Sequence, residues 1–498
     1  MGRMGQSGGP KTADTLSNIQ ILKRVLEIPG AKSILNGLSS YCEKDGQSRL
    51  LVALDLYFGA KHDACLRCKM AEKSVAAFVR LGSGAFGVSK DEMRKHFQDP
   101  YWRRGLASVI KGLGVFGLSK PFVPGAPIQV VWNITSRCNL NCRHCYASAN
   151  SVPLDEMGTA DAKMCIDKLA RWGVACIAFS GGEPLMRHDI LELASYSSSR
   201  GIYSAVATNG VLLSKEKCRE LKEAAVGYLQ ISLDGASPET HDAFRGVSGM
   251  FDRTITGIKN AVSEGFFVNI ATTVTQYNIA EIPKVIDLCE ALGVQWSMLY
   301  NFIPTGRGMS IETMDLTPEQ REAVLKLIWS KMKSSKVNIL STAPQFARVA
   351  LQADGPRCNV IPTHFANSEL GGQLQSLSDF IGGCGAGRFY MAMAGNGDII
   401  PCVFLPYVVG NVFRDDLDVL WKRSSTFLQL RNREQLKEHC GSCEFKYVCG
   451  GCRARAYSYF NDYTQPDPGC MLNIKAYERI LPNNSNNKNS CKEAIPSG

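Results

Sequence analysis

The pattern of apolar and polar positions changes near residue 126. Between residues 14 and 125 apolar side chains recur at helical spacing, as in Leu16, Ile19 and Leu22. Such spacing places apolar side chains on one face of a helix, where they pack against a core. We therefore expect a helical N-terminal region over residues 14–125.

From residue 128 onward, short apolar runs alternate with amphipathic stretches. The runs are VVWNIT, CIAFSGGEP, YSAVATNG, YLQISLDG, FVNIATTVT and VQWSMLYNF, and helical patterns such as 160–172 lie between them. Repeated strand–helix units of this length predict parallel strands with right-handed crossovers. Because six units are present rather than eight, we expect an α/β fold in which residues 126–340 form a partial (β/α)6 TIM-type barrel.

Beyond residue 340 the alternation stops. We expect a connecting segment over 341–383, a cysteine-rich domain over 384–480, and disordered polar tails over 1–13 and 481–498. A chain of 498 residues with 45% apolar composition is long enough for two or three domains with cores of their own.

Charge and targeting signals exclude some partners. Lys and Arg exceed Asp and Glu by ten, but the excess is spread along the chain, so we expect no nucleic acid partner. An acidic substrate or a membrane surface stays open. The polar start of the chain lacks a signal-peptide core, and no apolar stretch has the length of a membrane span. We expect a cytoplasmic protein, with peripheral membrane association as the alternative.

Nineteen cysteines change the picture most. Disulfide scaffolds are usually short secreted chains, so clustered cysteines here indicate metal. The first cluster, Cys138, Cys142 and Cys145, follows the first expected strand, at the active end of the barrel. Three thiolates bind three corners of a four-iron cluster and leave one iron open, which S-adenosylmethionine (SAM) can occupy through its amino and carboxylate groups.

The Cys-x3-Cys-x2-Cys spacing resembles the signature of the radical SAM superfamily. Ser180-Gly181-Gly182-Glu183-Pro184 looks like the GGEP motif of that family, and Thr208-Asn209-Gly210 and Ser232-Leu233-Asp234-Gly235 end the next two expected strands. The resemblance implies a [4Fe-4S] cluster that reductively cleaves SAM to a 5′-deoxyadenosyl radical, which abstracts hydrogen from a substrate. A structural zinc site is the alternative for three close cysteines.

The resemblance also implies a set of SAM contacts. Glycine backbone and Glu183 would meet the ammonium group, the hydroxyl and carboxylate of the fourth strand end would suit the ribose, and His144 would lie beside the adenine. Arg245 would face the SAM carboxylate, and Asn301 begins a segment that would touch adenine; a surface or capping role is the alternative for these two. The implied SAM-binding residues are His144, Gly181, Gly182, Glu183, Thr208, Asn209, Ser232, Asp234 and Arg245.

A second cysteine array resembles the SPASM extension, which holds auxiliary four-iron clusters in radical SAM maturases. By this resemblance the outer cluster would be bound by Cys440, Cys443, Cys449 and Cys470, and the inner cluster by Cys384, Cys402 and Cys452. Only Gly450-Gly451 separates the fifth and sixth cysteines of the array, where the family usually has three residues. Cys358 is the candidate fourth inner ligand; an open iron or a buried thiol is the alternative, and a pair of zinc ions is the alternative for the array.

The N-terminal region offers two further features. Cys42, Cys65 and Cys68, with His62 as an extra ligand, would suit a zinc or mononuclear iron centre, and unpaired thiols in a helical domain are the alternative. Residues 102–118 form a basic amphipathic pattern that would pack on the barrel or lie on a membrane.

The substrate has three candidates. WNIT-x-RCNL and CGGCRARAY look similar to segments of radical SAM enzymes of anaerobic haem and tetrapyrrole biosynthesis, which remove or oxidise carboxylate side chains. The alternatives are a peptide or protein maturase, a lipid- or cofactor-modifying enzyme, and, from another class, a non-catalytic iron–sulfur electron-transfer protein. The family implies an oxygen-sensitive oxidoreductase in an anaerobic host, with a low-potential ferredoxin or flavodoxin as electron donor.

Overall fold

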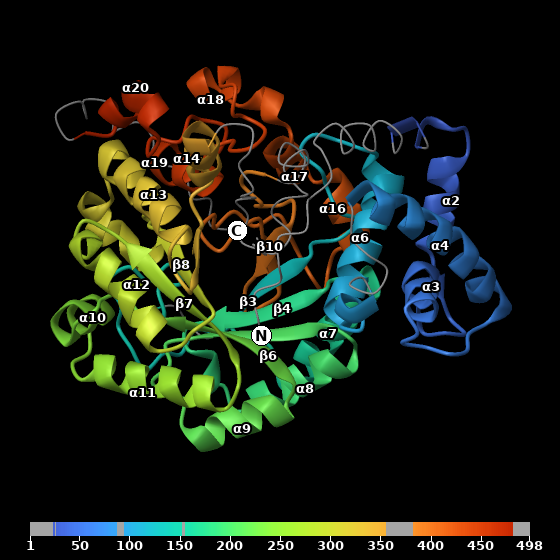
Figure 1. The fold of residues 1–498 in the computed structure, drawn as a ribbon, viewed down its shortest axis with the longest axis horizontal. Helices are drawn as coiled ribbons and strands as arrows, with labels where there is room; N and C mark the ends of the chain where they lie inside the picture. The colour runs from blue at the N-terminus through green and yellow to red at the C-terminus, as the bar shows by residue number, and fades with distance from the viewer. Residues whose placement is uncertain (1–22, 25, 87–93, 152–154, 355–381, 482–498) are drawn as a thin grey trace.

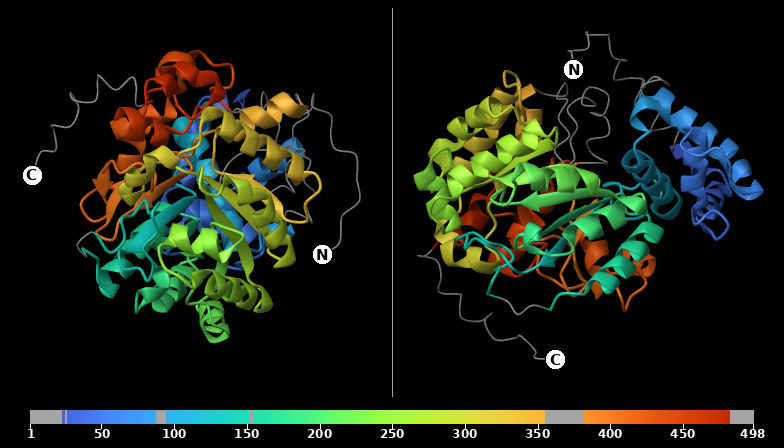
Figure 2. Two further views of the ribbon diagram at one scale, coloured as in Figure 1. Left: turned by 90° about the vertical axis from the view of Figure 1, so that its left-hand side faces the viewer. Right: turned by 90° about the horizontal axis from the view of Figure 1, so that it is seen from below.

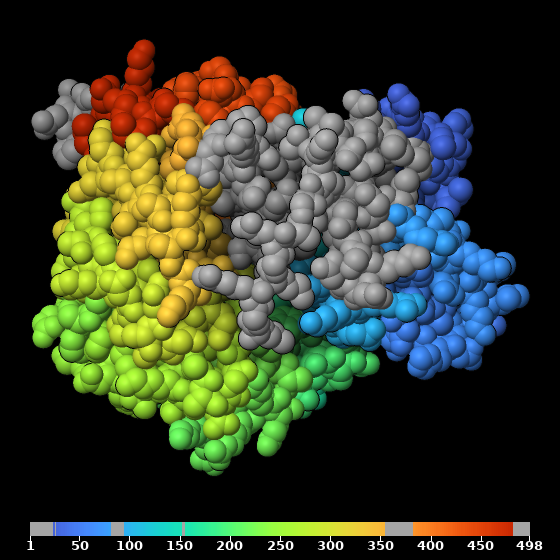
Figure 3. Space-filling model, in the orientation of Figure 1, coloured from blue at the N-terminus to red at the C-terminus, as the bar shows by residue number. Residues whose placement is uncertain are grey.

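The computed structural model describes residues 23–24, 26–86, 94–151, 155–354 and 382–481. An α/β barrel forms the centre of the molecule, with a helical lobe from the N-terminal region beside it and the C-terminal residues along one edge (Figure 1). The space-filling view shows the same three parts, blue for the N-terminal lobe, green to yellow for the barrel and red for the C-terminal residues (Figure 3).

Seven consecutive parallel strands form the barrel wall. Their order along the sheet follows the chain, and each pairs in parallel with the next. They are β3 (Gln129–Thr135), β4 (Cys176–Gly181), β5 (Tyr203–Thr208), β6 (Val226–Ser232), β7 (Phe267–Val274), β8 (Trp296–Asn301) and β9 (Asn338–Ser341). The partial barrel expected from the sequence is confirmed. It contains one strand more than the six units that the pattern predicts, because β9 has only four residues and its own pattern is weak.

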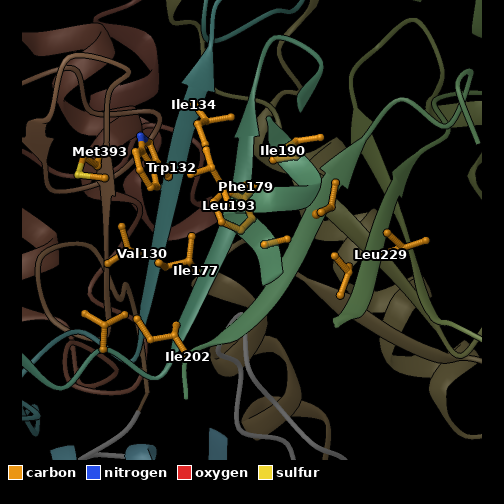
Figure 4. Close-up of a cluster of buried hydrophobic side chains, with 14 of the residues drawn as sticks. Val130, Trp132, Ile134, Ile177, Phe179, Ile190, Leu193, Ile202, Leu229 and Met393 are labelled. Atoms are coloured by element: carbon orange, nitrogen blue, oxygen red, sulfur yellow. The ribbon is translucent and has the colours of Figure 1, made fainter. Parts of the chain in front are cut away.

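Helices between the strands cover the outer face of the sheet, as the view from below shows (Figure 2). They are α7 (Thr159–Trp172), α8 (Ile190–Ser199), α9 (Lys215–Glu223), α10 (Pro238–Arg245), α11 (Met250–Ser263), α12 (Ile282–Ala291), α13 (Pro318–Met332) and α14 (Gln345–Asp354). The main core lies between these helices and the strands. Val130, Trp132 and Ile134 of β3 point toward it together with Phe179 of β4 (Figure 4). The alternate positions of these strands face the inside of the barrel.

The C-terminal residues extend the same sheet. β10 (Tyr390–Met393) pairs in parallel with β3, and β11 (Asp398–Ile400) and β12 (Gly410–Asn411) continue from it as antiparallel strands. The sheet therefore has ten strands in the order β12-β11-β10-β3 to β9. The helices of this part are α16 (Leu417–Arg423), α17 (Ser425–Arg431), α18 (Glu438–Ser442), α19 (Arg453–Phe460) and α20 (Ile474–Glu478).

The N-terminal region is largely helical. Its helices are α2 (Ala31–Leu38), α3 (Arg49–Tyr57), α4 (Leu66–Phe86) and α6 (Pro100–Phe116), and a hairpin of β1 (Tyr41–Cys42) and β2 (Gln47–Ser48) precedes α3. The two expected disordered tails lie almost wholly outside the described residues. Among the described residues, no helix is long and apolar enough to cross a membrane.

Helix α6 packs on α3 of the N-terminal lobe and on the barrel through charged as well as apolar side chains. Arg103 is buried and its Nε donates to Asp55 Oδ1 of α3 at 2.6 Å. Arg104 is also buried, and its guanidinium donates to the backbone oxygens of Ala170 and Val174 at 3.1 and 3.4 Å. These two guanidinium groups are therefore buried against protein groups rather than presented on an open face.

Candidate active site

A cavity of about 500 Å³ occupies the inside of the barrel. Cys138, Cys142 and Cys145 line it at the carboxyl ends of the strands, where the sequence pattern places the chemistry. Aromatic side chains make up much of the rest of its wall. They are Tyr101, Trp102, Tyr146, Tyr203, Tyr228, Phe267, Trp296, Tyr300, Phe302, Tyr390 and Phe404. Tyr101 and Trp102 come from α6, so the N-terminal region contributes to the wall of the cavity.

The loop after β3 holds the three cysteines in place. The backbone N–H groups of Leu140 and Ala149 donate to the sulfurs of Cys138 and Cys145 at 3.4 and 3.5 Å. The side-chain amide of Asn150 bonds the backbone N–H and carbonyl of Cys138 at 2.9 and 2.8 Å. Such N–H donors stabilise negative charge on the sulfurs of an iron–sulfur cluster. The donor set therefore fits three ligands of a cluster.

Burial opposes the thiolate form of these cysteines. It raises the pKa of Cys138 to about 11, with the neighbouring Cys142 and Glu183 adding to the rise. A metal must displace the protons, so binding of iron is expected to release them.

The two glycines at the end of β4, Gly181 and Gly182, let this strand end pack against the cysteine loop. A Cβ on Gly181 would lie 2.3 Å from the carbonyl oxygen of Thr135, and one on Gly182 would lie 2.1 Å from that of Arg137. The close approach allows the N–H of Gly182 to donate to Thr135 O at 2.7 Å, and that of Glu183 to Arg137 O at 2.8 Å. Both glycines also line the cavity. Here the motif positions the cysteine loop as well as forming the wall.

Glu183 is fully buried and fastens the end of β5. Its carboxylate accepts bonds from Thr208 Oγ1 and the Asn209 N–H, both at 2.8 Å, and from the Leu185 N–H at 3.1 Å. Burial raises the pKa of Glu183 to about 7, although these donors act in the opposite direction. Asn209 in turn donates to the side chain of Asn139 in the cysteine loop at 2.7 Å. The carboxylate thus joins two strand ends beside the cavity.

Asp234, at the end of β6, is fully buried and pairs with Arg245. Arg245 Nη2 lies 2.6 Å from Asp234 Oδ2, and the Thr273 N–H donates to Oδ1 at 2.7 Å. Arg245 also donates from Nη1 to the sulfur of Cys142 at 3.6 Å and lines the cavity. The carboxylate is therefore occupied by protein donors, whereas Ser232 of the same strand end faces the cavity.

His144 stacks on a phenylalanine. Its ring lies 4.1 Å from that of Phe244 at an interplanar angle of 11°, and its Nε2 lies 3.5 Å from Asp234 Oδ2. Burial, with Arg245 and Arg307 nearby, holds the pKa of His144 well below its usual value, so the ring is neutral. The buried Nδ1 of His144 and the Nδ2 of Asn301 have no partner among the described residues. A neutral ring and unpartnered polar atoms beside the cavity fit a nucleoside ligand.

The first part of the second cysteine array lies next to this cavity. Cys384, Cys402 and Cys452 line a smaller cavity of about 40 Å³, and the Tyr390 hydroxyl donates to Cys402 Sγ at 2.9 Å. Ile303, Tyr390 and Phe404 line both cavities. One layer of side chains therefore separates these three thiols from the inside of the barrel.

The remaining cysteines of the array form a second group. Electrostatic interactions link Cys440 with Cys443, Cys449 and Cys470. Cys440 Sγ accepts a bond from Asn473 Nδ2 at 3.3 Å, and the Gly451 N–H donates to Cys449 Sγ at 3.4 Å. These contacts fit thiolate ligands of one cluster. Cys358, the candidate fourth ligand of the inner group, lies outside the described residues.

Four residues near these groups were not singled out by the sequence. Arg433 and Arg453 are buried, and Arg433 Nη2 donates to the Cys384 carbonyl at 3.0 Å. Asp467 accepts from the Cys452 N–H at 2.7 Å. Trp102 lines the cavity from the N-terminal lobe. Of these residues, only Arg453 could have been selected from the sequence, because it directly follows the CGGC segment. The others reach the site through tertiary packing.

The structure also brings together cysteines of the N-terminal region. Cys42, Cys65 and Cys68 meet with Asp45, whereas His62, the ligand suggested by the sequence, is not part of the group. Asp45 was not predicted because it is a carboxylate rather than a cysteine or histidine, although its spacing from Cys42 equals that of Cys68 from Cys65. Cys165, Cys218 and Cys289 lie in the main core, whereas Cys176 lines the central cavity.

Comparison with known proteins defines the class. Residues 132–289 match the model of the radical SAM superfamily, and residues 384–444 match that of SPASM, described as an iron–sulfur cluster-binding domain. The AdoMet-dependent heme synthase of Methanosarcina barkeri is 37% identical over 348 residues, which is 70% of this chain and 97% of that protein. The chain belongs to the radical SAM superfamily and carries a SPASM domain; it is an enzyme of a family that uses [4Fe-4S] clusters and SAM.

Two further similarities bear on the substrate and the fold. The mycofactocin maturase MftC of Mycobacterium tuberculosis is 32% identical over 367 residues, which is 72% of this chain and 87% of that protein. The crystal structure of Streptococcus suis SuiB bound to its precursor peptide SuiA superposes with a TM-score of 0.59 at 18% identity, covering 84% of this chain and 92% of that one. The second similarity supports the fold.

Proposed function

We propose that this radical SAM enzyme abstracts hydrogen from a carboxylate side chain of a tetrapyrrole bound in the central cavity. The observation that carries the proposal is the cavity of about 500 Å³, which lies directly beside Cys138, Cys142 and Cys145 and has eleven aromatic side chains in its wall. Aromatic walls suit a flat macrocycle, since ring faces stack on one another. The 37% identity to a heme synthase supports the same class of substrate.

In this proposal Cys138, Cys142 and Cys145 hold the SAM-binding cluster. When bound, the cluster supplies the electron that splits SAM into methionine and a 5′-deoxyadenosyl radical. The chain positions the two groups. The N–H donors of Leu140 and Ala149 stabilise charge on the thiolates, and Arg245, 3.6 Å from Cys142 Sγ, adds a fixed positive charge.

The SAM contacts are assigned to groups that face the cavity and are not already held by other protein groups. Gly181, Gly182 and Ser232 face the cavity, and Thr208 and Asn209 line it while they are held by Glu183. We assign the backbone of the glycines to the ammonium group and Ser232 to the ribose.

The buried groups of this wall act through their neighbours. Asp234 keeps Arg245 in place, so Arg245 is left to meet the SAM carboxylate, and Asp234 and Glu183 are positioning residues. The neutral ring of His144, stacked on Phe244, is available to the adenine.

The auxiliary cysteines provide a route for electrons. Removal of a hydrogen atom and loss of carbon dioxide from a propionate leave an alkene and one electron. Cys384, Cys402 and Cys452 would hold the inner cluster, separated from the cavity by Ile303, Tyr390 and Phe404, and the group around Cys440 would hold the outer one. Cys358 stays the candidate fourth inner ligand. We propose a low-potential ferredoxin or flavodoxin as the reductant.

A peptide substrate is the second candidate, favoured by the 32% identity to a mycofactocin maturase. The N-terminal hairpin argues against strand pairing with a peptide, because β1 and β2 have two residues each. Binding to a lipid surface through α6 has less support, because Arg103 and Arg104 are buried.

The experiment uses the full chain, reconstituted anaerobically and reduced with dithionite. It is incubated with SAM and either iron coproporphyrin, a tetrapyrrole with propionate side chains, or a panel of peptides, and products are identified by mass spectrometry. We expect loss of carbon dioxide from the tetrapyrrole with matching formation of 5′-deoxyadenosine. An unchanged tetrapyrrole with a modified peptide would favour the maturase. If neither the tetrapyrrole nor any peptide changed, the substrate assignment would be overturned.

A further inference from the structure

A compact group of metal-ligating side chains lies in the N-terminal lobe, outside both family matches. Cys42, Asp45, Cys65 and Cys68 each offer one ligand atom, and these atoms all lie within 4.8 Å of one another. The family matches begin at residue 132 and do not include this lobe. We infer that the four side chains form a mononuclear zinc site, and this inference is independent of the proposed function.

The spacing of the ligand atoms selects a single ion. A tetrahedral zinc ion with Zn–S bonds of about 2.3 Å places two sulfurs about 3.8 Å apart. The sulfurs of Cys42 and Cys65 are 3.6 Å apart. An iron–sulfur cubane binds each thiolate through a different iron and needs wider spacing. Among the residues that the structure describes, the cysteines around the central cavity do not form a group this compact.

Two short turns build the group. Cys42 ends β1 and Asp45 lies in the hairpin turn, closed by a bond from the Gly46 N–H to the Cys42 carbonyl at 2.8 Å. Gly46 has φ +72°, which the turn requires of a residue without a Cβ. Cys65 precedes α4 and Cys68 lies in its first turn. Two ligand pairs, each separated by two residues, are typical of structural zinc sites, with Asp45 here in the place of a fourth cysteine.

Burial and charge fit a closed site. Cys68 is fully buried, and the side chains of Cys42 and Asp45 are nearly so. Three thiolates and one carboxylate around Zn²⁺ leave two negative charges, and Lys61 Nζ lies 3.4 Å from Asp45 Oδ1 as a partial counter-charge. The Cys65 N–H donates to the same carboxylate at 3.3 Å, which fixes its orientation. A Cys42–Cys65 disulfide would leave Cys68 and Asp45 without a role.

The position of the site indicates a structural role. It ties the β1–β2 hairpin to the start of α4, on either side of α3 in the chain. α3 carries Asp55, whose bond to Arg103 connects it to α6, and α6 supplies Tyr101 and Trp102 to the central cavity. Because four protein ligands complete a tetrahedron, no position is open for catalysis. The zinc ion would therefore support one wall of the substrate cavity without taking part in the reaction.

The test is the zinc content of the full chain, purified anaerobically with its clusters and measured together with iron by plasma mass spectrometry. We expect one zinc ion per wild-type chain, almost none in Cys68→Ser, and unchanged iron in that variant. Cys289→Ser removes a buried thiol of α12 and serves as the control that keeps its zinc. Asp45→Cys is the conservative variant. We expect it to keep its zinc, since a fourth thiolate replaces the carboxylate.

A spectroscopic measurement keeps the test valid where a variant fails to fold. Wild-type chain exchanged with Co²⁺ is expected to show the visible bands of tetrahedral thiolate-bound cobalt, with stronger sulfur-to-cobalt charge transfer in Asp45→Cys. Wild-type chain that holds no zinc and takes up neither zinc nor cobalt would overturn the site. Zinc that stays bound in Cys68→Ser would overturn the inferred site equally. So would additional iron bound in place of the zinc.

Discussion

The cysteine group of the N-terminal lobe and the cysteine group of the barrel differ in how they are closed. In the N-terminal lobe, three thiols and Asp45 converge within 4.8 Å and face one another. In the barrel, Cys138, Cys142 and Cys145 open onto a cavity of about 500 Å³. The first arrangement surrounds an ion completely and suits a structural role, whereas the second leaves space for ligand and substrate and suits catalysis. Geometry therefore separates two functions that the same residue type can serve.

The first prediction disrupts the group that opens onto the cavity, Cys138, Cys142 and Cys145. Cys142→Ala is expected to reduce 5′-deoxyadenosine formation to background, because the SAM-binding cluster loses one of its three thiolates. Zinc and the iron of the auxiliary clusters should remain. Chromatography of the reaction and metal analysis measure both, with Cys218→Ala, a buried core thiol, as the control. Undiminished 5′-deoxyadenosine in Cys142→Ala would refute the assignment.

The second prediction weakens the hydrogen bonds by which Glu183 holds the end of β5 beside the cysteine loop. Glu183→Gln places an amide N–H₂ among the three donors of Thr208, Asn209 and Leu185 and so leaves at least one buried donor unsatisfied. The cost of about 1–3 kcal/mol corresponds to SAM binding that is about 5-fold to 150-fold weaker. Calorimetric titration of the reconstituted protein measures this change. An unchanged affinity would mean that the end of β5 does not depend on Glu183.

The third prediction concerns the contact between the two regions. Trp102→Ala removes an aromatic side chain that α6 contributes to the cavity. We expect KM for the tetrapyrrole to rise about 10-fold, as for the loss of one apolar contact surface, with SAM cleavage in the absence of substrate unchanged. Steady-state kinetics test this, and Trp102→Phe should restore most of the affinity. A lower rate of SAM cleavage with unchanged KM would place Trp102 outside the substrate site.

The fourth prediction concerns the closed group and has the smallest effect on activity. Cys68→Ser should leave SAM cleavage within about twofold of wild type, because the zinc site lies outside the reaction. The N-terminal lobe should open more readily, since a structural metal contributes directly to folding. Limited proteolysis is expected to cut within residues 26–86 faster in the variant than in wild type. Equal proteolysis of both proteins would show that the metal does not stabilise the lobe.

The sequence predicts the barrel well, because the apolar positions of its strands and helices recur with clear periods. Its motifs also follow the ends of the expected strands. The cysteine loop and GGEP segment depend on local spacing, so Cys138 and Gly182 could be found from the sequence. The roles of Glu183 and Asp234 could not, because their partners, Thr208 and Arg245, come from other elements. Each carboxylate is turned inward to a neighbouring strand or helix.

Tertiary contacts also explain the other differences. β9 has four residues and is a strand because it pairs with β8, so its own pattern predicts little. β10 joins the barrel sheet beside β3 although more than 250 residues separate them in the chain. Asp45 completes a cysteine group only through the hairpin turn that brings it beside Cys65. Such long-range contacts are not encoded in the period of any one segment.

The central claim is that a tetrapyrrole in the cavity beside Cys138, Cys142 and Cys145 donates a hydrogen atom to the SAM-derived 5′-deoxyadenosyl radical, which becomes 5′-deoxyadenosine. Iron coproporphyrin deuterated in its propionate side chains tests it most directly, with mass spectrometry of the 5′-deoxyadenosine formed by the dithionite-reduced enzyme. The account predicts deuterium in 5′-deoxyadenosine together with loss of carbon dioxide from the tetrapyrrole. Unlabelled 5′-deoxyadenosine and an intact tetrapyrrole would contradict it.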